Sequence, residues 1–343
     1  MSSTASTAPT DPQRVADFWS TKRNDRRPTG WMDHHTIQAW LHRRITGNPS
    51  LSTVAWWKQQ YFPEAVGCAL SLGCGFGELD RNLIALGIAE HVQAVDIAAG
   101  AVEQARATAT AAGLGDRIDY RVANLDEIEL APSAFDAIFA SSSFHHVVRL
   151  EHLFGQCRRA LRPGALLFLD DYVGPSRFQS GPQVFDLMNR VVALLPERYR
   201  RNLFTDDGAL VERITPQALD YFASHDPSEA IRSAEIIPAL TRDFEIVEHR
   251  PYGGALLHLL LSGIVGNFDE TCERDTMFLT LLATMEHTLE EHGILDSDFA
   301  VIVARPRGGD GAADSPKPLT AASADTRPSG RIQTDPLPGT QRP

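Results

Sequence analysis

The fold is decided by the stretch Cys68-Ala69-Leu70-Ser71-Leu72-Gly73-Cys74-Gly75-Phe76-Gly77-Glu78-Leu79-Asp80. An apolar run that breaks into alternating glycines and resumes as an amphipathic segment is typical of a strand, a tight loop and a helix. Glycine is required where the backbone turns sharply and approaches a ligand without a Cβ in the way. The first N–H groups of the following helix point at that ligand. The stretch therefore predicts a binding loop.

A second apolar run, His91-Val92-Gln93-Ala94-Val95, follows and ends in an acid, Asp96. A carboxylate at the end of such a strand can accept hydrogen bonds from both ribose hydroxyls of a nucleoside. The glycine loop and Asp96 together predict a nucleoside site, although a glycine turn that only packs a helix on a strand is the alternative.

The glycine spacing separates two kinds of nucleoside ligand. A dinucleotide fingerprint requires a third glycine at position 78, where this chain has Glu78. A carboxylate there would repel a pyrophosphate at close range. It is compatible with S-adenosylmethionine, whose amino acid end is zwitterionic and whose sulfonium is positive. A nicotinamide oxidoreductase is accordingly the disfavoured alternative.

The region from Cys68 to Asp170 resembles the class I S-adenosylmethionine-dependent methyltransferases. The resemblance rests on the glycine loop from Leu70 to Gly77, on Asp96, on Phe135-Asp136-Ala137-Ile138-Phe139-Ala140 and on the turn Leu161-Arg162-Pro163-Gly164. It implies S-adenosyl-L-methionine as cofactor. The cofactor contacts that it implies in the first two motifs are Gly73, Cys74, Gly75, Gly77 and Asp96.

The alternation of strand and helix patterns predicts an α/β fold. We expect a Rossmann-like, seven-stranded, mostly parallel sheet with helices on both faces and a helical cap. The expected strands are 69–72, 92–96, 118–122, 136–140, 166–170, 244–250 and 299–304. Core helices are expected at 78–86, 100–112 and 150–161, and inserted helices at 182–195, 216–224, 228–239, 256–266 and 275–292.

These elements predict the following domain organisation. A disordered tail (1–14) precedes an N-terminal helical lid (15–60), in which a helix at 33–45 lies over the pocket, and the cofactor-binding core (61–171). One helical cap insertion (172–243) precedes the sixth strand and a second (253–297) precedes the seventh, so that the last core strands occupy 244–252 and 298–305. The chain ends in a Gly/Pro/Ser/Thr-rich tail (306–343), which we also expect to be disordered.

Ligands of such sheets collect at the carboxyl ends of the strands, which directs attention to the residues after each strand. In the resembling family the position of Asn124 carries an acid that binds the adenine amino group, and Asn124 can still accept that bond. Ile97 and Leu125 would pack on the adenine ring, and Ser141 would line the same site. Arg44 would bind the cofactor carboxylate. As alternatives, Asn124 caps a turn, and the helix that carries Arg44 simply packs on the sheet edge.

The fourth strand is followed by three serines, Phe144, His145 and His146. In a methyltransferase this segment runs beside the transferred methyl group, and a histidine can take a proton from an acceptor hydroxyl. His146 is the preferred base and His145 the alternative, and a structural role stays open for each. No cysteine or further histidine stands at a ligand spacing nearby, so no metal site is predicted.

The fifth strand ends at Asp170 and is followed by Asp171, Tyr172 and Arg177. Two acids at a strand end are costly to bury unless they interact with another group, for example by orienting a base or by pairing with a cation. Asp171, Tyr172 and Arg177 are therefore acceptor-side candidates, with a surface salt bridge as the alternative. This segment resembles a bacterial subgroup of the family associated with sugar or secondary-metabolite biosynthesis.

The composition is compatible with an enzyme acting on small molecules. A net charge of -12 argues against a nucleic-acid substrate. No apolar run is long enough to span a bilayer, the start of the chain lacks the parts of a signal peptide, and the four cysteines have no metal-ligand spacing. These features predict a cytoplasmic protein without membrane partners. A homodimer through the apolar helix 256–264 is an open alternative to a cap role.

We therefore predict an S-adenosylmethionine-dependent O-methyltransferase that acts on a small molecule, a sugar or natural product, with a histidine general base. The alternatives are an N-methyltransferase, and a protein that binds the cofactor without methyl transfer and whose cap serves a partner.

Overall fold

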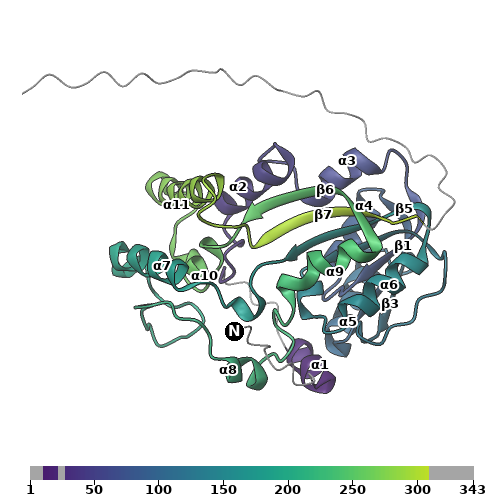
Figure 1. Ribbon diagram of the computed structural model, residues 1–343, viewed down its shortest axis with the longest axis horizontal. Coiled ribbons are helices and arrows are strands. Elements are labelled where there is room, and N and C mark those ends of the chain that lie inside the picture. The colour runs from purple at the N-terminus through teal and green to yellow at the C-terminus, as the bar shows by residue number, and fades with distance from the viewer. Residues whose placement is uncertain (1–10, 22–27, 309–343) are drawn as a thin grey trace, which may run out of the picture. The chain divides into compact units, whose positions relative to one another are not determined.

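The computed structural model describes residues 11–21 and 28–308. Its centre is a seven-stranded sheet in the order β3-β2-β1-β4-β5-β7-β6 (Figure 1). The strands are β1 (Val66–Leu72), β2 (Ala89–Asp96), β3 (Ile118–Val122), β4 (Phe135–Ser141), β5 (Leu161–Tyr172), β6 (Phe244–Gly253) and β7 (Phe299–Pro306). Strands β1 to β5 pair in parallel, and β7 is antiparallel to both β5 and β6. The predicted Rossmann-like, mostly parallel sheet is confirmed.

The strand register brings the loops after β1, β2 and β4 to one edge of the sheet. Leu72, the last residue of β1, pairs with Val95 on one side and with Ala140 on the other. The chain leaves β1 toward β2 and later returns to place β4 on the opposite side of β1. This reversal of strand order leaves a crevice at the carboxyl end of β1.

The α-helices flank this sheet and build the cap. They are α1 (Pro12–Thr21), α2 (His35–Thr46), α3 (Thr53–Tyr61), α4 (Glu78–Ala85), α5 (Ala99–Ala111), α6 (Leu150–Ala160), α7 (Pro182–Leu194), α8 (Leu219–Ser224), α9 (Ile236–Asp243), α10 (Leu257–Leu261) and α11 (Glu273–Glu291). Short 3-10 turns are η1 (Phe144–His146), η2 (Ser176–Phe178), η3 (Glu197–Tyr199), η4 (Ser233–Glu235) and η5 (Val265–Asn267).

Both faces of the sheet are covered because its central strands are apolar on both sides. Phe139 and Phe168 stack at 4.8 Å between ring centroids, and Trp57 of α3 packs on them. Helices α4 and α5 bury their apolar residues in the same cluster. On the opposite face, Ile138 packs with buried residues of α6 and α9, among them Phe154. Near-continuous apolar strands are typical of parallel sheets buried on both faces.

Some predicted elements differ from the structure, among them the helix 256–266, which ends at Leu261. The expected turn at Leu161–Gly164 is part of β5, where the register with β4 shifts and Gly164 has φ 83°. The expected helix 228–239 begins only at η4 and α9, because the backbone before them bonds elsewhere: the N–H groups of Ile231 and Arg177 donate to the carbonyls of His145 and Ala230.

The two inserted segments contact each other. Tyr199 of η3 stacks on Phe268 at 4.4 Å, and the N–H of Leu203 donates to the carbonyl of Gly263 at 2.8 Å. The side chains of α10 are buried in this contact, including Leu257 and Leu261. Most apolar side chains of the predicted helix 256–264 are therefore covered within the chain, and the homodimer stays a prediction.

The ends of the chain are only partly described. The predicted disordered tails lie largely outside the described residues, which begin at 11 and end at 308. Residues 12–14, assigned to the first tail, belong to α1, and Pro306 ends β7. In the described part of the chain, no helix is long and apolar enough to cross a membrane.

Candidate active site

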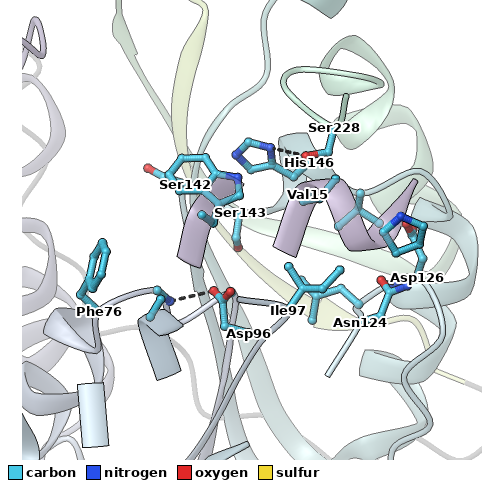
Figure 2. Close-up of a pocket in the computed structure, with 17 residues that line it drawn as sticks. Val15, Phe76, Asp96, Ile97, Asn124, Asp126, Ser142, Ser143, His146 and Ser228 are labelled. Atoms are coloured by element: carbon cyan, nitrogen blue, oxygen red, sulfur yellow. Dashed lines mark hydrogen bonds between the residues drawn. The ribbon is translucent and has the colours of Figure 1, made fainter. Parts of the chain in front are cut away.

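A pocket opens at the crevice beside β1. Its walls come from the loops after β1, β2, β3 and β4, from α1 and from the loop before η4 (Figure 2). The lining residues are Pro12, Val15, Trp19, Gly73, Gly75, Phe76, Asp96, Ile97, Ala101, Asn124, Leu125, Asp126, Ser142, Ser143, His146, Val147 and Ser228. Figure 2 shows Asp96 and Ile97 on one side and His146 and Ser228 on the other.

The glycine loop needs its glycines for two different reasons. Gly73, Gly75 and Gly77 have φ angles of 71°, 49° and 76°, in the left-handed region that side chains rarely adopt. A Cβ at Gly73 would collide with the side chain of Ser143, so this glycine allows two strand-end loops to meet. A Cβ at Gly75 would meet no atom within 4 Å, so it would project into open pocket space. The loop thus forms a cradle that a side chain would fill.

Asp96 is fixed by the loop that it faces. Its Oδ2 accepts the N–H of Gly75 at 2.8 Å, and its Oδ1 accepts the N–H of Ala98 at 2.8 Å. Burial raises the pKa of Asp96, and these amide hydrogen bonds oppose that rise. Each carboxylate oxygen keeps a second lone pair for a ligand hydroxyl. The loop and the acid therefore hold one another in place at the pocket wall.

Asn124 has a local bond of its own. Its Oδ1 accepts the N–H of Asp126 at 3.0 Å, so the alternative of a turn cap is present in the structure. Asp126 in turn accepts the N–H groups of Val148 and Arg149 at 2.9 and 2.7 Å. Asn124 and Leu125 nevertheless line the pocket, and Figure 2 shows Asn124 beside Ile97.

His146 stands on the opposite wall. Its Nδ1 lies 3.0 Å from Ser228 Oγ, and Ser228 Oγ lies 2.6 Å from Asp226 Oδ1. Asp226 accepts, so the serine hydroxyl donates to it, and His146 Nδ1–H donates to the serine oxygen. Burial, and then the positive charge of His145, lowers the pKa of His146. At neutral pH the ring is uncharged, with its lone pair on Nε2.

His145 is in a different electrostatic environment. Its Nδ1 lies 2.5 Å from Asp171 Oδ1 and its Nε2 lies 3.5 Å from Glu229 Oε1. Burial would lower the pKa of His145, but Asp171 and Glu229 raise it to about 10. The buried Asp171 also accepts the N–H groups of Ser143, Phe144 and Tyr172. This carboxylate therefore fixes both the histidine and the backbone of the segment that carries it.

Several predicted site residues do not line the pocket. Arg44 forms an ion pair with Glu290 of α11 at 2.6 Å and is not among the residues that line the pocket. The helix over the pocket is α1, not the predicted helix at 33–45. Arg177 donates to the carbonyls of Glu229 and Pro227, both at 2.7 Å.

Tyr172, Cys74, Gly77 and Ser141 are also absent from the lining of the pocket. The Tyr172 hydroxyl donates to the carbonyl of Pro175 at 2.9 Å, and its ring packs on Phe178 and Phe299. The lining residues do not include Cys74, Gly77 or Ser141, although their sequence neighbours Gly75, Phe76 and Ser142 are among them.

Other pocket residues were missed by the sequence analysis. Val15 and Trp19 come from α1, in a segment given only as a lid, and Ser228 comes from the cap insertion. Asp226 does not line the pocket but accepts the hydroxyl of Ser228. The sequence Asp226-Pro227-Ser228 carries a turn signal, because Asp226 accepts both the N–H and the hydroxyl of Ser228. That signal predicts the turn but not its position beside His146.

Two groups of side chains each bring three potential metal ligands together. They are His145, His146 and Glu229, and His34, His35 and Glu270, with ligand atoms within 4.8 Å of one another in each group. With a pKa raised to about 10, His145 keeps a proton on Nε2, the atom that a metal would need. His34 Nδ1 accepts the N–H of Thr36 at 3.1 Å, so the proton of neutral His34 is on Nε2. We assign a metal to neither group.

Residues 70–169 match the family described as a methyltransferase domain. This chain carries a class I methyltransferase domain. The match covers the glycine loop, Asp96, Asn124 and both histidines, and it ends within β5. The predicted family is thereby confirmed, while the narrower subgroup stays a prediction.

Curated relatives match part of this chain. The 27-O-demethylrifamycin SV methyltransferase of Amycolatopsis mediterranei is 33% identical over 106 residues, which are 30% of this chain and 38% of the relative. The ubiquinone biosynthesis O-methyltransferase of Methylocella silvestris is 35% identical over 99 residues, 29% of this chain and 37% of the relative. The chain thus matches less than two thirds of either relative's length.

Solved structures are similar over more of the chain. The geranyl diphosphate C-methyltransferase of Streptomyces coelicolor is 12% identical and aligns over 86% of this chain and 97% of its own, with a TM-score of 0.49. A methyltransferase of Mesorhizobium loti is 19% identical over 72% of this chain and 94% of its own, with a TM-score of 0.42.

Proposed function

We propose that this protein transfers a methyl group from S-adenosylmethionine to a hydroxyl of a small molecule, with His146 as the general base. The observation that carries the proposal is a single pocket that has the glycine loop and Asp96 on one wall and an uncharged histidine on the other. The family match and the methyltransferase relatives support the cofactor and the reaction class.

The cofactor wall fits S-adenosylmethionine. Asp96 would accept both ribose hydroxyls, and the open floor at Gly75 would take the methionine end, which has no bulky side-chain neighbour there. Ile97 and Leu125 would pack on the adenine ring, and Asn124 would accept its amino group with the remaining lone pair of Oδ1. When bound, the cofactor supplies an electrophilic methyl group on a sulfonium.

The base assignment follows from the two histidine environments. A base must be unprotonated at the working pH and must face the acceptor. His146 lines the pocket and has a lowered pKa, so its Nε2 can take the hydroxyl proton as the acceptor oxygen attacks. His145 holds its proton between Asp171 and Glu229 and does not serve as the base. Its role is to fix the segment 143–146 against β5.

Alignment supplies the rest of the rate enhancement. The acceptor oxygen must lie in line with the methyl–sulfur bond, and fixing that geometry is worth up to about 7 to 11 kcal/mol relative to free reactants. Trp19 of α1 and Val147 line the pocket, and their apolar surfaces would help to exclude water from the reacting atoms. The acceptor, a sugar or natural product, would enter on the histidine side.

Calorimetric titration with S-adenosylmethionine and, separately, with NADH tests the cofactor. Micromolar binding of the first alone is expected. A screen of hydroxylated and amine metabolites with labelled cofactor then identifies the acceptor, and labelled products on oxygen are expected. Binding of neither cofactor would overturn the proposal, and labelled amines without labelled hydroxyls would replace it with N-methylation.

A further inference from the structure

A chain of hydrogen bonds connects the first helix to His146. Trp19 Nε1–H donates to Asp226 Oδ2 at 2.9 Å, and the Ser228 hydroxyl donates to Asp226 Oδ1 at 2.6 Å. Ser228 Oγ also lies 3.0 Å from His146 Nδ1. The four residues come from α1, from the loop before η4 and from η1, so the chain joins three parts of the sequence.

Each bond in this chain has one possible direction. The indole N–H of Trp19 only donates, so Asp226 must accept at Oδ2. The Ser228 hydroxyl has one proton and gives it to the carboxylate, so its oxygen can only accept from His146. A backbone bond from Ser228 N–H to Asp226 Oδ1 at 2.9 Å holds the serine in place. The chain therefore requires the Nδ1–H tautomer of His146 and leaves Nε2 unprotonated.

The same helix covers the cofactor side of the pocket. Val15 is buried in the pocket lining, and the hydroxyl of Ser20 accepts the N–H of Gly100 at 3.2 Å, at the start of α5. At the other side, Arg14 donates to the carbonyl of Ser224 at 3.3 Å, and the Trp19 ring lies edge-on to His146 at 5.3 Å between centroids. Helix α1 thus bridges the cofactor wall and the acceptor wall.

We propose that Asp226, acting through Ser228, is a positioning residue for His146, and that Trp19 couples the docking of α1 over the pocket to the formation of the base. With α1 docked, Trp19 occupies one carboxylate oxygen and Ser228 the other, so the serine presents a lone pair to His146. Without Trp19, Asp226 can rotate and Ser228 can turn its proton toward the ring, which removes the fixed tautomer. The proposal rests on the role of His146 given above.

The tautomer can be measured directly, without knowledge of the acceptor. Long-range proton–nitrogen NMR spectra of full-length protein labelled with nitrogen-15 in histidine distinguish Nδ1–H from Nε2–H rings, and His146→Gln assigns the resonance. We expect the Nδ1–H form in the wild type and the Nε2–H form, or a mixture, in Ser228→Ala. Ser228→Thr keeps a hydroxyl and should restore the wild-type pattern. Ser224→Ala, which removes an exposed hydroxyl of the same segment, should leave it unchanged.

Trp19→Phe tests the coupling to α1, because it keeps an aromatic ring and removes only the donor. We expect a partial loss of the fixed tautomer and an affinity for S-adenosylmethionine about threefold lower, since one hydrogen bond to a carboxylate is lost. Asp226→Asn offers an independent break of the chain, because an amide cannot accept from both donors. An unchanged His146 tautomer in all three variants, with folding verified by thermal melting, would overturn the proposal.

Turnover separates this role from a structural one. Once an acceptor is found, Ser228→Ala should lower kcat about tenfold at unchanged cofactor affinity, and Ser228→Thr should restore it. In the pH profile of kcat, the pH at which kcat falls on the acid side should differ between Ser228→Ala and the wild type. The groups facing His146 are His145 on η1, Asp171 on β5, and Asp226 and Glu229 before η4. Wild-type protein that binds no cofactor would refute the proposed function and leave the tautomer result standing. Active protein whose kcat does not respond would refute the coupling alone.

Discussion

The two walls of the pocket are built in different ways. The cofactor wall comes from short sequence motifs, in which Asp96 reaches back 21 positions to bond Gly75. The acceptor wall is assembled over long distances: His146 and Ser228 are 82 positions apart, and Trp19 and Asp226 are 207 apart. Local motifs fix the first wall, whereas the second depends on how α1 and the inserted segments pack.

The difference separates what is general in this fold from what is particular to this chain. A backbone loop and one acid suffice to hold a nucleoside, and both follow from strand order. Selecting and deprotonating an acceptor requires side chains whose ionisation is tuned by neighbours, and tuning needs buried partners from elsewhere. The walls should therefore respond to substitution in separable ways.

The largest separation is expected for His146→Ala. Loss of the base should lower kcat about 10³-fold, in the middle of the range for a general base, while the affinity for S-adenosylmethionine changes less than about twofold. Because the base must be neutral and its pKa is lowered, wild-type kcat should fall only below about pH 6.5. Labelled-cofactor turnover and calorimetry measure the two quantities.

A matched control is His91→Ala, which removes an exposed histidine at the far end of β2. This substitution should change neither kcat nor the affinity for S-adenosylmethionine. If His146→Ala retained full turnover, proton removal by this residue would be excluded, and the acceptor wall would act by alignment alone.

The second prediction concerns the stability of the acceptor wall. Asp171→Asn should lower the free energy of unfolding by about 3 kcal/mol, since it breaks a buried pair and weakens three backbone bonds to one carboxylate. The exposed pair of Asp186 and Arg190 provides the control, and Asp186→Asn should cost about 0.3 kcal/mol. Urea unfolding of both variants measures the difference.

The pH dependence of the free energy of unfolding tests whether the charged His145 stabilises the acceptor wall. The pKa of His145 is raised to about 10 in the folded state, against about 6.5 unfolded, so the folded protein binds the extra proton more tightly. Its stabilisation is complete below about pH 6.5 and is lost as the pH rises toward 10. The stability difference between wild type and His145→Gln should shrink over that window. A difference that grows with pH would contradict the assignment of the proton to His145.

The sequence predicted the cofactor wall because its signals are local. Glycines at alternate positions and an acid at a strand end describe a backbone path, and the structure has Gly73, Gly75 and Asp96 at the pocket. The number of strands and the approximate position of most strands and core helices follow from the same short-range patterns.

The acceptor wall was predicted only in part. His146 was found from its place after β4, but its partners were not, since no pattern places Ser228 beside it. The segment before α9 was predicted as helix, yet Ala230 and Ile231 are buried in irregular backbone, where the Ile231 N–H donates to the His145 carbonyl at 3.1 Å. Tertiary hydrogen bonds there override a local preference.

The third prediction returns to the cofactor wall. Asp96→Ala should weaken S-adenosylmethionine binding about 30-fold, the effect of losing charged hydrogen bonds to a ligand and the bonds that fix Gly75. Glu103→Ala, on the exposed side of α5, is the matched removal of a carboxylate and should have no effect. Calorimetry measures both affinities. An unaffected Asp96→Ala variant would show that the nucleoside lies elsewhere.

The smallest effect on cofactor binding is expected for a substitution of Arg44. The sequence analysis predicted Arg44 as a cofactor contact, but in the structure it does not line the pocket. Arg44→Gln should change the affinity for S-adenosylmethionine less than about twofold, because its guanidinium pairs with Glu290, donates to the carbonyl of Pro251 and does not line the pocket. The same variant should lower the melting temperature, since Glu290 is left buried without its cation.

Combining Arg44→Gln with Glu290→Gln separates an effect on stability from an effect on cofactor affinity. The double variant removes both charges, so it should regain stability relative to Arg44→Gln while its cofactor affinity stays at the wild-type value. If affinity instead fell tenfold in both variants, α2 would have to move Arg44 to the pocket when the cofactor binds. The cofactor wall would then also depend on long-range packing, and the contrast between the two walls would lose its basis.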